Sequence, residues 1–178
     1  MSDIQDNQSN PVVLKFGGVL RGWLVEEGGS RVDIDYQAIH RTGRVKVWLT
    51  RGEERKSVYL PREVSFAMHD IRGSQVDSHR GAWLWSHFWM EAAEGVLHQE
   101  ADWMREPVIG GDPVGDGDAV FELDQFPRDP QWVPEWMVVK AAAYHKEAER
   151  WEREWRARKK AEAAQAEGDG ADESGDGV

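Results

Sequence analysis

Four side chains that can ligate a metal recur in the middle of the chain, at intervals of four, three and four residues. They are His87, Glu91, Glu94 and His98. On a helix this spacing places all four on one face, where imidazole and carboxylate groups can chelate a divalent cation. No Glu-x-x-His pair accompanies them. The stripe therefore allows a metal-dependent enzyme, with a solvated polar helix face as the simpler interpretation.

A second set combines basic and aromatic residues between positions 19 and 60. If Val45, Val47 and Leu49 point inward, their neighbours in an alternating strand point outward. The residues expected on this outer face are Arg21, Trp23, Arg44, Lys46, Trp48, Arg55 and Tyr59. Such a surface can stack nucleic-acid bases and contact phosphates, or hold a peptide between aromatic rings. It can equally be covered by later helices, and Asp33 and Asp35 on a neighbouring strand argue against nucleic acid.

The chain contains ten tryptophans, and indole side chains recur where one protein surface grips another. Trp151 and Trp155 end an apolar seam with spacings of four, three, four, three and four residues. The seam consists of Met137, Ala141, Tyr144, Ala148, Trp151 and Trp155. This heptad pattern predicts a helix from about Pro134 to Ala164. We expect the helix either to pack on the middle helix or to project and bind a partner or a second copy.

Motifs of conventional catalysis are missing from the sequence. It holds no Gly-x-Ser-x-Gly, no Gly-x-x-x-x-Gly-Lys and no cysteine, which removes the common hydrolase, phosphate-loop and thiolate patterns. We therefore favour a binding protein without a cofactor over an enzyme.

The local sequence patterns predict an α+β fold. Short alternating segments with Gly-rich turns between residues 11 and 60 indicate a small antiparallel β-barrel or curved meander. The pattern resembles SH3-like and Sm-like barrels. A long helix is expected over residues 78–104 and the seam helix after it, with an acidic irregular connection at residues 105–131 between them.

Composition gives the domain plan. Residues 1–10 and 165–178 are polar or acidic and are expected to be disordered; between them we predict a β domain at 11–75 and a helical region at 76–164. No stretch is apolar enough to span a membrane and no signal peptide is visible. The sequence thus predicts a cytoplasmic protein, and its composition is compatible with a phage origin.

The net charge of −11 disfavours general nucleic-acid binding. Residues 76–140 carry four basic and thirteen acidic side chains, so this segment could instead imitate nucleic acid and block a basic protein. We expect an interaction or assembly protein that binds a protein partner or itself. The residues expected to bind are Trp23, Trp48, Tyr59, Trp151 and Trp155. A nucleic-acid-binding barrel using Arg21, Arg44, Lys46 and Arg55, and the metal-dependent enzyme, remain alternatives.

Overall fold

The computed structural model describes residues 9–172. Within them the chain forms a five-stranded antiparallel sheet, a two-stranded ribbon and four α-helices. In chain order the elements are α1 (Pro11–Glu26), β1 (Arg31–Ile39), β2 (Thr42–Arg51), β3 (Glu54–Val58), α2 (Arg62–Ser74), β4 (Trp85–Glu91), β5 (Leu97–Asp102), β6 (Val108–Ile109), β7 (Asp112–Pro113), α3 (Asp116–Gln125), the 3₁₀ turn η2 (Pro130–Trp132) and α4 (Glu135–Asp172).

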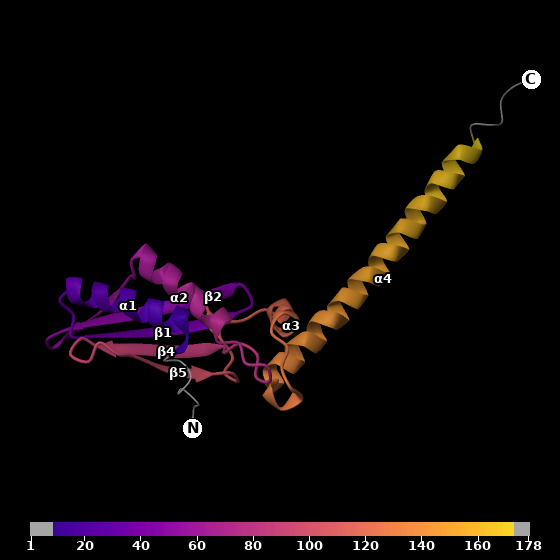
Figure 1. The fold of residues 1–178 in the computed structure, drawn as a ribbon. Coiled ribbons are helices and arrows are strands. Elements are labelled where there is room, and N and C mark those ends of the chain that lie inside the picture. Colours follow the sequence, from indigo (N-terminus) through magenta and orange to yellow (C-terminus); the bar gives the residue numbers. More distant parts are fainter. Residues whose placement is uncertain (1–8, 173–178) are drawn as a thin grey trace, which may run out of the picture.

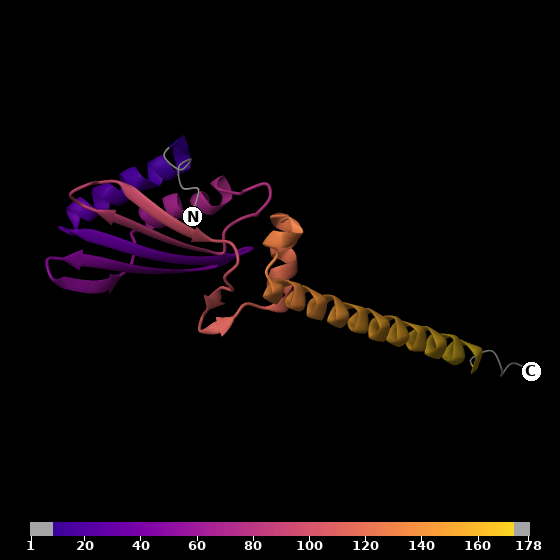
Figure 2. The ribbon, with the colours of Figure 1, turned by 90° about the horizontal axis from the view of Figure 1, so that it is seen from below.

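The main sheet has the strand order β3-β2-β1-β4-β5, with every neighbouring pair antiparallel. Helices α1 and α2 lie side by side on one face of it (Figure 1). The opposite face carries no helix in the described part of the chain, and α3 and α4 sit beyond one end of the sheet (Figure 2). The fold is therefore two-layered, with one sheet face open.

The main core lies between the sheet and these two helices. Alternation along β1 turns Val32 and Ile34 toward the helices, and both are fully buried. Phe16 of α1 meets Phe88 of β4 edge-on, with ring centroids 5.8 Å apart. Ile71 of α2 completes this layer and is also fully buried. These aromatic and aliphatic contacts hold the helices to the sheet.

The α+β class is confirmed, but the expected barrel is wrong because the sheet is open, ending at β3 and β5. Residues 11–26, expected as strands, form α1. The Asn10 side chain accepts hydrogen bonds from the amides of Val12 and Val13 and caps this helix. Its buried positions recur at helical intervals despite three glycines. The glycines, which suggested turns, therefore lie inside a helix that tertiary packing stabilises.

The long helix expected over residues 78–104 is also wrong, because most of this segment forms the β4–β5 hairpin. In β4, Ser86, Phe88 and Met90 are buried, and the residues between them are half-buried on the other face. Gly95 in the connecting turn has φ +63°, a conformation that glycine adopts without strain. Strands from the predicted β domain (11–75) and from the predicted helical region (76–164) thus belong to one sheet.

The acidic connection at residues 105–131 is more ordered than expected, because it contains β6, β7, α3 and η2. A second core joins this region to α4 and to the end of β1. It contains Ile39, Leu84, Val114, Ala119 and Met137. Helix α4 begins next to Pro134, as predicted, and extends to Asp172. Of the two expected disordered ends, residues 1–8 and 173–178 lie outside the described residues.

Candidate interaction surfaces

The apolar seam of α4 is packed in its first part and uncovered in its second. Met137 is fully buried, and the Tyr144 ring meets the Phe121 ring of α3 edge-on at 5.9 Å. From residue 145 to residue 165 every side chain is exposed, including Trp151 at 63% and Trp155 at 43% of full exposure. Helix α4 therefore leaves the body of the protein after Tyr144 (Figure 1). We call residues 145–165 the projecting half of α4.

Charged side chains flank the uncovered part of this seam. In the heptad that places Trp151 and Trp155 at seam positions, Glu147, Glu152 and Glu154 occupy the adjacent positions that border a partner helix. All three pair within the helix: Glu147 lies 2.9 Å and Glu154 3.9 Å from Arg150, and Glu152 lies 2.6 Å from Arg156. These pairs lie one turn apart and are well exposed, so they support the helix only weakly. The border of the seam is acidic.

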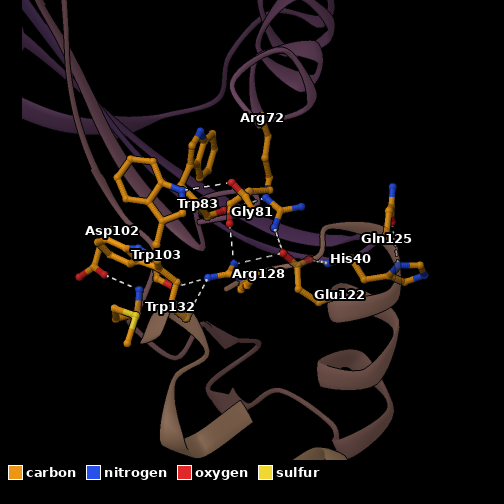
Figure 3. Close-up of polar contacts among 12 residues, drawn as sticks. His40, Arg72, Gly81, Trp83, Asp102, Trp103, Glu122, Gln125, Arg128 and Trp132 are labelled. Atoms are coloured by element: carbon orange, nitrogen blue, oxygen red, sulfur yellow. Dashed lines mark hydrogen bonds and ion pairs between the residues drawn. The ribbon is translucent and has the colours of Figure 1, made fainter. Parts of the chain in front are cut away.

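The base of α4 is fixed by a buried ion cluster around Glu122 of α3 (Figure 3). The Glu122 carboxylate is fully buried and lies 2.6 Å from the guanidinium of Arg72 and 3.4 Å from that of Arg128. Arg72 also donates to the Trp83 carbonyl, and Arg128 donates to the carbonyls of Trp103 and Ala82. Burial lowers the pKa of Arg128, and the Glu122 charge opposes that effect. The cluster ties α3 and the segment before α4 to α2 and the sheet.

The β1–β2 hairpin joins the same cluster through His40. Its backbone N–H donates to Glu122 at 2.5 Å, and its Nδ1 lies 2.9 Å from the Gln125 side-chain oxygen. His40 has φ +48°, a conformation that costs a non-glycine residue energy. These two contacts with α3 compensate that cost. The β1–β2 hairpin therefore helps α2 and the sheet to hold α3, and the first part of α4 packs on α3.

The open face of the sheet carries a row of stacked rings. Trp85, His87 and Trp89 of β4 stack along the strand, and Trp89 stacks on His98 of β5 with centroids 5.1 Å apart. Arg105 lies over Trp85 at 5.0 Å. Because the rings cover one another, their flat faces are already occupied. This surface therefore offers ring edges, not open platforms, to a ligand.

The structure separates the four residues of the proposed metal stripe. His87 lies between two aspartates, with Nδ1 2.7 Å from Asp35 and Nε2 3.3 Å from Asp33. His98 instead contacts Glu94 at 3.2 Å. Within residues 9–172 no group of three or more histidine, aspartate or glutamate side chains is arranged to hold a metal ion. The helical face that motivated the stripe does not exist, since these residues belong to a hairpin.

The other predicted binding residues are scattered over the fold. Arg44, Lys46, Trp48 and Arg55 do belong to the open-face set of β2 and β3, and Arg55 lies 5.0 Å above Trp48. Arg21 and Trp23 belong to α1 instead, and Trp23 is buried against the core. Tyr59 follows β3 and is 98% exposed.

Acidic groups also lie on the open face. Burial raises the pKa of Asp33, but the hydrogen bond and charge of Arg31, with the charges of Arg55 and His87, outweigh it and hold the pKa below its ordinary value. Asp33 remains ionised at neutral pH. Its charge offsets part of the basic character that a nucleic-acid surface requires.

Sequence reasoning missed the Glu122 cluster. Arg72, Glu122 and Arg128 come from separate parts of the chain, and their spacing carries no local pattern. A weak signal exists in α3, where Glu122 lies among Ala119, Val120 and Leu123 on an otherwise apolar stretch. A carboxylate in that position calls for a buried cationic partner.

The chain matches no model of a known protein family, and a search of curated proteins finds no similar sequence. Among the described helices, none has the length and apolar character needed to cross a membrane.

Proposed function

We propose that this protein is a non-catalytic interaction protein whose projecting half of α4 binds a helix of a partner protein. One observation carries the proposal. The seam that packs on α3 as far as Tyr144 continues without a break into Trp151 and Trp155, which have no packing partner within the described chain. Two exposed indoles one turn apart on a projecting helix provide an anchor of the kind found at the centre of protein interfaces.

The acidic border of the seam selects the partner. In a parallel pair of α4 helices, Glu147 of one copy would face Glu152 of the other. In an antiparallel pair centred on the tryptophans, Glu152 and Glu154 would each approach their own counterparts. Both arrangements place like charges together, so the preferred partner is a helix with an apolar seam bordered by Lys or Arg.

A charge-swap experiment tests this proposal. Two designed amphipathic peptides share one apolar seam and differ only in bordering Lys or Glu residues. Tryptophan fluorescence of the full chain should show binding of the Lys-bordered peptide that is about tenfold tighter than that of the Glu-bordered one. The E152K/E154K variant should reverse the preference, and W151A/W155A should bind neither peptide.

Sedimentation of the full chain supplies the control. We expect a monomer at micromolar concentration, with unchanged circular dichroism in both double variants. If the full chain forms a dimer that the W151A/W155A substitutions dissociate, the seam binds a second copy of this chain and not a partner protein. If W151A/W155A binds the two peptides as tightly as the wild type does, the seam has no role in binding.

A further inference from the structure

A cavity of about 550 Å³ opens where β3 ends. Strand β3 pairs with β2 only over residues 47–51 of β2, so residues 42–46 are paired on the β1 side alone. Helix α2 passes beside this part of β2 and contributes Ser65, Met68 and His69 to the cavity wall. A smaller cavity of about 210 Å³ adjoins it and shares Tyr36, Arg41, Gly43 and His69 with it. The two form one groove along the unpaired edge of β2, next to α2.

The groove has both apolar and polar wall residues. Val47 and Met68 are buried side chains of its wall. Tyr36 is only 4% exposed, and its hydroxyl lies 3.2 Å from Nδ1 of His69. Burial raises the pKa of the Tyr36 hydroxyl, while the charge of Arg72 acts against this. The groove thus combines apolar wall residues with a buried polar pair, as small-molecule sites do.

The charge of the groove is opposite to that of the chain. Arg41 lines both cavities. Arg44 and Lys46, whose side chains leave β2 on the open face, line the larger cavity at the unpaired edge of this strand, and no aspartate or glutamate lines either cavity. None of these three cations has an ion pair among residues 9–172, whereas arginines elsewhere on the sheet, such as Arg31 and Arg51, are paired. In a protein of net charge −11, three unpaired cations around one cavity form a local attraction for anions.

We propose that this groove binds a small molecule that carries an anionic group, carboxylate or phosphate, on an apolar body. The apolar body lies against Val47 and Met68, near the Tyr36 hydroxyl. The anionic group meets Arg41, Arg44 and Lys46 at the rim. The volume falls in the range of sites that enclose small ligands. The proposal is independent of α4, because no residue of α4 lines the groove.

Four eight-carbon probes separate the contribution of charge from that of the apolar body. Octanoate and octyl phosphate carry the anion, 1-octanol is neutral and octylamine is cationic. Titration calorimetry of the full chain should show binding of one or both anions, and much weaker binding of octanol and octylamine. Whichever anion binds more tightly identifies carboxylate or phosphate as the preferred group. Amide shifts in an NMR titration should concentrate at Gly43, Tyr36 and His69.

Matched charge variants locate the site. R41E/K46E should weaken binding of the anions at least about tenfold. The control K15E/K160E changes the net charge equally at exposed positions outside the groove and should leave binding unchanged. R41A provides a milder variant if R41E/K46E loses its folded circular dichroism spectrum.

Four outcomes would overturn the proposal. They are equal affinity for octanol and the anions, equal weakening by both double variants, absence of binding by both anions at millimolar concentration, and tighter binding of an oligonucleotide than of octyl phosphate at the same amides. The last would assign the basic rim to nucleic acid.

Discussion

Glu122 is the residue that connects α3 and the segment before α4 to α2 and the sheet. Its carboxylate is shielded from water and compensates two guanidinium groups at once. Removing one member of a buried ionic group leaves the remaining charge desolvated and uncompensated.

We therefore expect Glu122→Gln to lower the free energy of unfolding by about 3–5 kcal/mol, because it leaves Arg72 and Arg128 without a counter-charge. Urea denaturation followed by circular dichroism measures this loss. Asp124→Asn, on the exposed side of the same helix, is the control and should change stability by less than about 0.5 kcal/mol. Similar stabilities for the two variants would show that the cluster does not hold α3.

Asp33 gives the protein a defined acid sensitivity. Its pKa is lower in the folded protein than the value of about 3.9 for an unfolded chain. The folded state therefore favours the ionised form, and this stabilisation is present above about pH 4 and lost as the pH falls through the folded pKa. The free-energy difference between wild type and Asp33→Asn should be largest near neutral pH and shrink toward pH 3. Asp70→Asn, which removes one carboxylate from an exposed position of α2, is the control for the change in net charge.

At the scale of elements, α4 offers a comparison within a single seam. Tyr144 packs on Phe121 and lies close to Gly117, whereas Trp151, two turns later, is exposed. Tyr144→Ala should lower the free energy of unfolding by about 1–3 kcal/mol because it removes a tertiary contact. Trp151→Ala should leave thermal unfolding almost unchanged. Equal losses would mean that the projecting half packs on the body in solution.

The elements also show how far the sequence can be interpreted alone. The seam of α4 and the alternation of β1 and β2 are strong periodic patterns, and both predicted their elements correctly. The sequence misassigns segment 85–102 because Trp85 and Trp89 on the open face are as apolar as Phe88 and Met90 on the core face. The strand therefore shows no alternation of polar and apolar residues. In α1 the glycines hid the helical period, which becomes evident only once its buried residues meet the sheet.

The candidate surfaces follow the same rule. The seam that contains Trp151 and Trp155 was predictable, because a heptad pattern is local, but the sequence left open whether this part of the seam is covered or exposed. The groove beside β2 was not, since it depends on β3 ending opposite Val47 and on α2 crossing beside it. The Glu122 cluster was hidden for the same reason, because it depends on contacts between distant segments.

At the scale of the whole molecule, α4 makes the protein elongated. A helix of 38 residues is about 57 Å long at 1.5 Å per residue. A compact chain of this length would have a radius of gyration of about 16 Å, and we expect small-angle X-ray scattering to give a clearly larger value at low concentration. A value near 16 Å would mean that α4 folds back on the body.

The projecting half also concentrates arginine and lysine on an unsupported helix. The projecting half makes no contact with the body of the protein among residues 9–172, and it contains Arg153, Arg156, Arg158, Lys159 and Lys160. Local opening there needs only the loss of helical hydrogen bonds and weak surface pairs. Trypsin should thus cut this segment first and leave a resistant fragment containing the sheet and α3, as mass spectrometry would show. A bound partner helix would slow that first cut, so the lifetime of the intact chain would report whether the partner is present.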